Sequence, residues 1–234
     1  MSAKKLSTLL ILASLGLSAC SDDDEPMTMM PPDPDPVMIS YDVTVTNLTH
    51  AHPLSPLAVI LHQNDGFWAI GEMASPELEM LAESGDNSQL IAMADAMVSA
   101  SGTGLIMPGN SETVSITIED VDDANLTIAS MLANTNDGFT GLNGLALGEL
   151  AIGGSWSGVG FVYDAGTEAN TEAMGSIVGP ADGGEGFSEI RDDVNYVAMH
   201  PGIVSMDDGL STSVLTQAHR FDNPAMKVVI TRTE

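Results

Sequence analysis

Short segments in which apolar and polar residues alternate recur along most of the chain, and they constrain its fold more than any other feature. Residues 41–46 alternate Tyr, Val and Val with Asp, Thr and Thr, and residues 114–118 repeat the pattern with Val and Ile. This two-residue period is typical of a strand with one buried face. Further strands are expected at residues 57–61, 126–131, 159–163, 196–199 and 226–230. The pattern predicts a mainly β protein.

Two helices are expected between the second and third strands. Ser75-Pro76-Glu77 combines an N-cap residue, a proline for the first turn and an acid near the positive end of the helix dipole, and Gly85 would end this helix. Asp86 is expected to cap a second short helix that carries Leu90, Ala94 and Met97. Short strands with turn signals and two helical insertions favour one antiparallel β-sandwich over residues 41–234.

The first twenty residues have the pattern of a processing signal. Lys4 and Lys5 form a basic start, and residues 6–16 are apolar but too few to span a bilayer as a helix. The following Leu17-Ser18-Ala19-Cys20 resembles the lipobox of bacterial lipoproteins. The resemblance implies cleavage of a signal peptide at residues 1–19 and lipidation of Cys20. With Ser21 in the next position, it also implies sorting to the outer membrane of the bacterial cell envelope.

Residues 20–40 are expected to form a tether. The stretch is rich in Asp and Pro, contains no Lys or Arg, and shows no repeating apolar face. Such a composition buries too little apolar surface to order itself. Cys20 is also the only cysteine of the chain, so an intrachain disulfide is excluded.

The charge balance limits the partners. There are 33 Asp and Glu residues against 6 Lys and Arg residues, which gives a formal net charge of −27. A field of this sign repels nucleic acid and anionic lipid and favours cations or basic partners. We therefore expect no nucleic-acid partner, and contact with a membrane through the lipid on Cys20. Acidity spread this widely also suits solubility in salty surroundings.

One acidic turn stands out. The segment Asp164-Ala165-Gly166-Thr167-Glu168 follows the apolar run 159–163 and places two carboxylates on either side of a glycine. Glycine permits a sharp turn, which would bring both acids towards one point. Ca²⁺ prefers such clustered carboxylate and carbonyl oxygens. The spacing by itself favours a solvated acidic turn, which is the commoner arrangement.

Several segments together resemble the spondin N-terminal domain family, which occurs in F-spondin, mindin and many bacterial secreted proteins. The likeness covers roughly residues 41–234. It rests on Ser55-Pro56, His62, the helix segment from Gly71 to Gly85, Asn136-Asp137-Gly138-Phe139, Tyr163-Asp164-Ala165-Gly166-Thr167-Glu168 and Asn223-Pro224-Ala225-Met226-Lys227-Val228.

The resemblance implies a β-sandwich with a calcium ion near one end. In the animal domains an acid at the position of Asp137 and the two acids of the turn, here Asp164 and Glu168, hold the ion. The animal turn ends in Asp, whereas this chain has Glu168, which is one methylene longer and keeps the carboxylate. The animal domains also have disulfides, which this chain lacks.

Other metal and catalytic motifs are weaker. His50 and His52 lie two residues apart, but no cysteine or adjacent acid completes a zinc or copper site. The remaining histidines stand singly and are expected to be hydrogen-bonded structural residues. The methionines at 73, 80, 93 and 97 are expected in the core. The segment 154–158 has the composition of a nucleophile elbow with Trp156 at its centre, which is the wrong register.

The leading functional interpretation is a lipid-anchored, calcium-stabilised surface module that binds another macromolecule, protein or glycan, as in adhesion. The alternative is a glycan-binding or glycan-hydrolysing surface protein with an acidic site. A chain with 33 acids contains many pairs that would suit a glycosidase, and the sequence selects none of them.

Overall fold

The computed structural model describes residues 35–119, 121 and 123–234. The expected signal peptide, Cys20 and most of the expected tether lie outside the described residues. The chain divides into the units Met1–Asp35 and Pro36–Glu234, and the second contains every element described below. Its first strand begins at Met38, three residues before the expected start at Tyr41.

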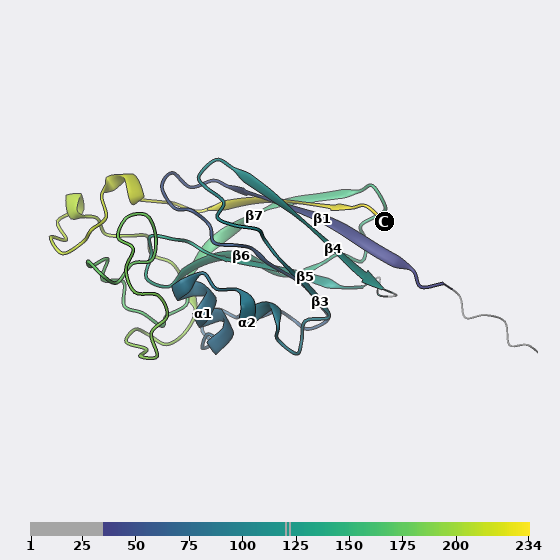
Figure 1. Cartoon of the computed structure of the whole chain (residues 1–234), viewed down its shortest axis with the longest axis horizontal. Coiled ribbons are helices and arrows are strands. Elements are labelled where there is room, and N and C mark those ends of the chain that lie inside the picture. The colour runs from purple at the N-terminus through teal and green to yellow at the C-terminus, as the bar shows by residue number, and fades with distance from the viewer. Residues whose placement is uncertain (1–34, 120, 122) are drawn as a thin grey trace, which may run out of the picture. The chain divides into compact units, whose positions relative to one another are not determined.

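Within the described residues, nine strands form an antiparallel sheet in the order β3-β2-β5-β6-β7-β9-β1-β4, and β8 pairs with β7 (Figure 1). The strands are β1 (Met38–Asn47), β2 (Ala58–His62), β3 (Val98–Ser101), β4 (Ser111–Glu119), β5 (Asn125–Met131), β6 (Gly138–Ala146), β7 (Ser155–Asp164), β8 (Ala198–Met199) and β9 (Met226–Arg232). The prediction of a mainly β protein is confirmed, and so are the seven expected strand positions, although β8 is only two residues long.

Strands β3 and β6 were not expected from the sequence. β6 reads Gly-Phe-Thr-Gly-Leu-Asn-Gly-Leu-Ala, and three glycines in nine residues argue against a strand on propensity alone. It nevertheless pairs with β5 on one side and β7 on the other. Glycine suits the close packing here, because a side chain at Gly141 would meet the carbonyl oxygen of Ile128 at 2.2 Å. Pairing with the two neighbouring strands therefore determines that this segment forms a strand.

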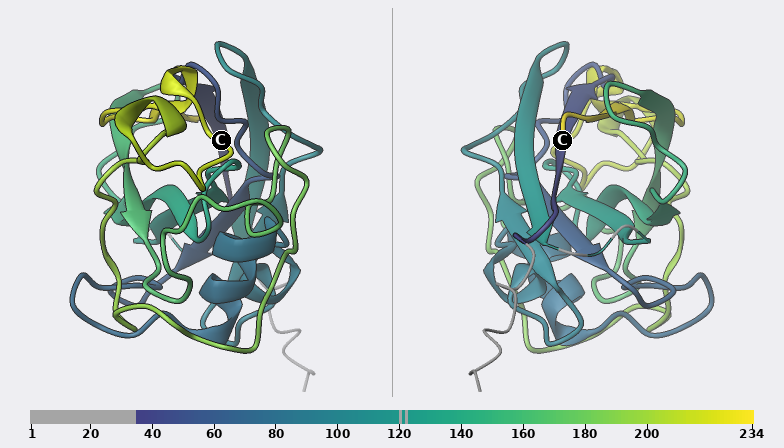
Figure 2. Two further views of the ribbon diagram at one scale, coloured as in Figure 1. Left: turned by 90° about the vertical axis from the view of Figure 1, so that its left-hand side faces the viewer. Right: turned by 90° about the vertical axis from the view of Figure 1, so that its right-hand side faces the viewer.

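Strand β7 joins two parts of the sheet. Its residues 155–160 pair with β9, whereas residues 161–164 pair with β6. The sheet curves so strongly that its two edge strands, β3 and β4, lie against each other (Figure 2). Next to them the backbone N–H of Thr103 donates to Oε1 of Glu112 at 2.6 Å. The curved sheet thus encloses a large apolar core, and a second buried cluster includes the apolar face of the helix at residues 76–84.

The alternating residues supply that core. In β1 and β4, every second residue is buried while its neighbours face outward. The principal buried side chains are Ile39, Tyr41, Val43, Val45, Val59, Leu61, Val114, Ile116, Ile118, Leu126, Ile128, Val162, Val228 and Ile230. On the outer face, hydroxyls pair across the strands, as in Thr44–Thr113 and Thr46–Ser111 at 2.8 and 2.7 Å.

Helix α1 (Pro76–Ser84) forms as expected. Ser75 Oγ accepts from the N–H of Leu78 at 3.2 Å, and the N–H of Gly85, which has a positive φ of 74°, donates to Leu81 O at 2.9 Å. The buried face of α1 packs on β5 and β6 and includes Leu78, Leu81, Ala82, Glu79 and Glu83. None of the described helices is long and apolar enough to cross a membrane.

The expected second helix is shorter than predicted. Helix α2 (Ser88–Ile91) has one turn, so Ala94 and Met97 lie beyond its end. Its N-cap position is taken by Asn87, whose amide donates to the carbonyls of Pro56 and Leu57 at 3.0 and 2.9 Å. Asp86 still accepts the N–H of Ser88 at 2.9 Å. The helix ends early at its other end, where Met97 N donates to Leu61 O of β2 at 2.9 Å and the chain enters β3.

The long glycine-rich segment after β7 lies beside α1 and is held by specific contacts (Figure 1). Thr135 forms a β-bridge with Val178, and Gly184 N donates to Ile177 O at 2.7 Å. Two short 3₁₀ helices, η1 (Met206–Asp208) and η2 (Gln217–His219), precede β9. The segment covers the ends of β6 and β7, where the candidate site lies.

Candidate metal centre

The pairing of β6 with β7 brings Asp137 to the acidic turn. Asp137 directly precedes β6, and Asp164 is the last residue of β7. Gly138 is paired with Asp164 across the two strands, and the N–H of Ala165 donates to the carbonyl of Asp137 at 3.2 Å. This antiparallel register places the two carboxylates at the same end of the sheet.

Gly166 gives the turn its shape. Its φ of +71° lies in the left-handed region, and an added Cβ would sit 2.3 Å from the carbonyl oxygen of Tyr196. The N–H of Gly166 donates to Asp164 Oδ1 at 2.8 Å, and its carbonyl accepts from Asn195 N at 2.7 Å. Only glycine combines this conformation with so close a backbone neighbour.

Asp137 is the central residue of the site and is completely buried, at 0% exposure. Its Oδ2 accepts three hydrogen bonds, from Thr167 N at 2.7 Å, Glu168 N at 3.1 Å and Thr167 Oγ1 at 3.2 Å. Its Oδ1 is buried and has no hydrogen-bond partner. Burial, and then the negative charge of Asp164, raise the pKa of Asp137 to about 7. The unpaired oxygen is the strongest sign of a ligand in the site.

Asp164 is also buried but has partners on both oxygens. Besides Gly166 N on Oδ1, the amide of Asn170 donates to Oδ2 at 2.6 Å. Burial raises the pKa of Asp164, although both hydrogen bonds act in the opposite direction. Each carboxylate oxygen has a second lone pair, so these contacts leave room for a cation.

Glu168 lies among other acids. Burial raises its pKa to about 8, and the charges of Glu83, Asp137 and Asp192 add to the effect in that order. Nearby, the N–H of Ala169 donates to Asp192 Oδ1 at 2.9 Å, which ties the turn to the glycine-rich segment. Several carboxylates that repel one another in a buried place are stabilised by a divalent cation.

The three residues predicted from the sequence therefore lie in one region, with Asp137 beside both of the others. Among the described residues, no group of three or more His, Cys, Asp or Glu side chains has an arrangement that would hold a metal ion. The convergence of Asp137, Asp164 and Glu168 on one ion stays a prediction. The donor atoms do suit Ca²⁺, because they are all hard oxygens and one of them is buried without a partner.

Sequence reasoning missed other members of this region. Glu83, from α1, is buried, and its Oε2 accepts from Ser188 N at 2.8 Å. Asn170 binds Asp164, and Asp192 binds the turn. The repeat of acids at positions 79 and 83, one turn apart on a helix with an apolar face, was the only signal for Glu83. The positions of Asn170 and Asp192 depend on the folded loop.

A cavity of about 300 Å³ opens beside Glu168. Its lining combines acids, amides and hydroxyls with one exposed apolar side chain, and consists mainly of Asn136, Glu168, Thr171, Ser176, Ser188, Ile190 and Asp192. Water can therefore reach the Glu168 side of the region, whereas Asp137 is shielded by the turn.

The histidines at 50 and 52 do not form a pair. His50 is exposed, whereas His52 is buried with Nδ1 2.7 Å from Ala133 O and Nε2 2.5 Å from His219 O. Both of its ring nitrogens are thus occupied by carbonyls. His62 has the expected structural role, with Nε2 2.7 Å from Thr127 Oγ1.

His200 has the expected hydrogen bond on only one of its ring nitrogens. Its Nδ1 accepts from Gly202 N at 3.1 Å, which leaves the proton on Nε2 in the neutral ring, and Nε2 is buried without a partner. Burial, and to a smaller degree the charge of His52, lower the pKa of His200 to about 4. The ring is therefore neutral in the folded protein.

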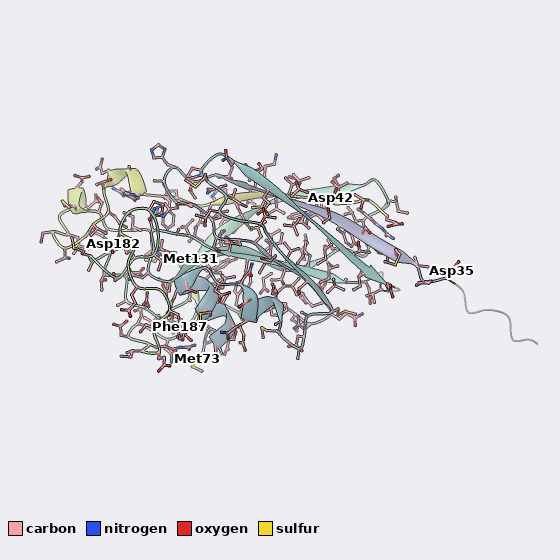
Figure 3. All side chains as sticks on the ribbon, viewed as in Figure 1. Asp35, Asp42, Met73, Met131, Asp182 and Phe187 are labelled. Atoms are coloured by element: carbon pink, nitrogen blue, oxygen red, sulfur yellow. The ribbon has the colours of Figure 1, made fainter. Side chains whose placement is uncertain are left out.

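The expectation that four methionines belong to the core is wrong for two of them. Met73 is 66% exposed and precedes α1, where Figure 3 shows its side chain, and Met97 is 43% exposed. Both lie outside the helices that were expected to bury them. Met80 and Met93 are half-buried, and Met93 packs on the cluster beneath α1.

Comparison with protein-family models finds no family that matches this chain, and comparison with curated proteins finds no match.

Proposed function

We propose that this chain is a lipid-anchored protein of the bacterial cell envelope, a non-enzymatic adhesion module that binds Ca²⁺ and another macromolecule.

 The observation that carries this proposal is the buried Oδ1 of Asp137, which has no hydrogen-bond partner although Asp137 lies near Asp164 and Glu168. A hard cation would satisfy this oxygen.

In the proposed site, the carboxylates of Asp137, Asp164 and Glu168 hold the ion, and backbone carbonyls and water complete its coordination. The ion supplies positive charge where three acids repel one another. Each acid then stays ionised despite its burial, because the cation cancels both the repulsion and part of the cost of desolvation. The calcium-loaded turn is rigid, and its outer side offers a surface to a partner.

The fold and the family belong to the same proposal. We infer that the two parts of the sheet joined by β7 act as the two layers of a β-sandwich. The pairing of β6 with β7 next to the acids supports a domain similar to the spondin N-terminal family, whose motifs the sequence resembles. Glu168 in place of the Asp of the animal domains would change the affinity for calcium without removing the ligand.

Thermal melting of the purified chain in chelator and in millimolar Ca²⁺ tests the site. Calcium at a hundred times its Kd should stabilise the folded state by about 2.7 kcal/mol, which corresponds to roughly 5–10 °C for a domain of this size. Asp164→Asn should reduce or abolish the shift. Mg²⁺ should substitute poorly, because it demands a tighter octahedron and loses water reluctantly.

Asp22→Asn is the matched control, because it removes the same charge from the acidic N-terminal stretch. Its calcium shift should equal that of the unmodified chain. Identical melting curves in chelator and in calcium, together with no bound metal by elemental analysis, would refute the calcium site.

The partner is tested separately. The chain should retain an envelope protein or glycan in a pull-down with calcium and lose it in chelator. A screen against glycosides and esters addresses the enzymatic alternative. Saturable turnover that disappears on substitution of Glu168 or Asp192 would overturn the non-enzymatic proposal.

A further inference from the structure

Helix α1 carries two buried acids one turn apart, and only one of them is neutralised. Glu79 receives hydrogen bonds from Nε and Nη2 of Arg191, and the two residues form an ion pair. Glu83 is 1% exposed, and its Oε2 accepts from Ser188 N at 2.8 Å. Its other oxygen, Oε1, is buried and has no hydrogen-bond partner. A buried carboxylate oxygen left without a partner is costly.

Glu83 lies close to the acidic turn. Burial has the largest effect on the pKa of Glu83 and raises it, whereas the N–H of Ser188 and the nearby Thr167 side chain lower it. The charge of Glu83 is also the largest charge effect on Glu168, ahead of that of Asp137. Thr167 in turn donates through both N and Oγ1 to Asp137. Glu83 and Asp137 therefore approach the same two residues of the turn, from α1 and from β6.

Access to this place comes from the cavity beside Glu168. Both Glu168 and Ser188 line it, and Ser188 is the residue whose N–H holds Glu83. Two orphaned oxygens, Asp137 Oδ1 and Glu83 Oε1, thus belong to side chains that converge on Thr167 and Glu168. Arg191 does not serve as the missing cation, because its guanidinium is bound to Glu79, Asn195 and the carbonyl of Ala74.

We propose that Glu83 is a further ligand of the calcium ion and binds it through Oε1, so that the ion links α1 to the acidic turn. The inference rests on the proposed calcium site and adds to it a carboxylate from a different element. Its consequence is mechanical: binding of the ion would fasten α1 and the segment around Ser188 to the turn, in addition to holding the turn itself.

Calcium titration of the purified chain, followed by calorimetry, tests the role of Glu83. Glu83→Gln should weaken calcium binding roughly tenfold or more, because ligand charge count tunes affinity in such sites. In chelator the same variant should melt at or above the temperature of the unmodified chain, since it removes a buried, repelled charge. Glu77→Gln is the matched control, with the same change on a half-exposed residue of the same helix, and should bind calcium as the unmodified chain does.

The outcomes separate this inference from the site itself. Equal calcium affinity of the unmodified chain and Glu83→Gln would overturn the role of Glu83 and leave the site intact. No calcium binding by any of the proteins would refute both.

A second measurement needs no variant. Hydrogen exchange of the unmodified chain should show that calcium protects the amides of residues 80–85 and of Ser188, as well as those of the turn. Protection confined to residues near 137 and 164–168 would contradict the proposal, even if Glu83→Gln failed to fold.

Discussion

At the scale of single residues, two polar groups are buried without a hydrogen-bond partner, and the cost of this burial is reduced in a different way for each. Asp137 Oδ1 and His200 Nε2 are both buried without a hydrogen-bond partner. The carboxylate lies near other acids, and we propose that a cation binds it. The imidazole lies beside Phe221, with ring centroids 5.2 Å apart, and remains neutral, which is the less costly state in an apolar place. The neighbouring residues thus determine which of the two groups is a candidate for ligand binding.

The neutral state of His200 predicts a loss of stability in acid. Its pKa is lowered to about 4 in the folded protein, against 6.5 as the ordinary value. The unfolded chain therefore takes up the proton first, and the contribution of neutral His200 is complete above about pH 6.5 and is lost as the pH falls towards 4. The loss should approach about 3 kcal/mol.

Chemical unfolding at several pH values measures this effect by comparison with His200→Asn, which keeps an acceptor for Gly202 N and does not titrate. The difference in free energy of unfolding between the two proteins should be flat above pH 6.5 and should change in favour of the variant below it. His50→Asn, at an exposed position, should show no such change. A pH-independent difference for His200→Asn would contradict the assignment.

At the scale of elements, the acidic turn depends on two neighbours more than on its own five residues. The register of β6 on β7 places Asp137 beneath it. On the other side, the backbone of Tyr196 and Asn195 closes over Gly166, with the N–H of Asn195 donating to the carbonyl of Gly166. The turn is therefore packed between a strand end and a returning loop, which limits the conformations that its acids can adopt.

Gly166→Ala should destabilise the protein by more than the conformational cost of placing alanine at a positive φ. Gly153 has a similar φ of +76° but no atom within 4 Å of an added Cβ, so Gly153→Ala isolates the conformational cost of about 1–2 kcal/mol. At Gly166 the Cβ would also meet Tyr196 O at 2.3 Å, and the backbone must shift.

We expect Gly166→Ala to cost clearly more than Gly153→Ala in free energy of unfolding and to diminish the calcium-dependent melting shift as well. Gly153→Ala should leave that shift unchanged. Equal destabilisation by the two substitutions would show that the close approach of Tyr196 does not constrain the turn.

At the scale of the whole molecule, cohesion comes from apolar packing and hydrogen bonds. The chain has 33 acids and 6 Lys and Arg residues, so few acids can be paired. Within the described residues the ion pairs are Arg191–Glu79 and Arg220–Asp208, and the second is largely exposed. An exposed pair contributes little to stability. Divalent cations are the natural complement of the remaining negative charge.

The proposed attachment to the membrane concerns the whole chain and depends on Cys20, outside the described residues. Cys20→Ser should abolish labelling with a lipid precursor and release the protein from the membrane fraction of bacteria that express it. Ser21→Asp should keep the lipid and move the protein towards the inner membrane. Unchanged labelling and fractionation of Cys20→Ser would disprove the lipid anchor.

The sequence by itself determined the features that depend on a few neighbouring residues. The alternation of apolar and polar residues predicted β1 and β4, because the two faces of a strand are set by local geometry. The residues Ser75, Pro76 and Gly85 marked both ends of α1, because helix caps are also local. The acidic turn was recognised for the same reason. The second helix was predicted too long, because the chain after Ile91 leaves the helix and Met97 N donates to Leu61 O at the start of β3, a contact that no local pattern encodes.

Only the tertiary structure decided which of the many acids meet. A chain with 33 acids offers no local means of choosing among them, and the choice follows from the pairing of β6 with β7 and from the packing of α1. β6 itself, with three glycines, exists because strands on both sides pair with it. The unpaired oxygens of Asp137 and Glu83 arise in the same way, since burial and missing partners are properties of the assembled fold.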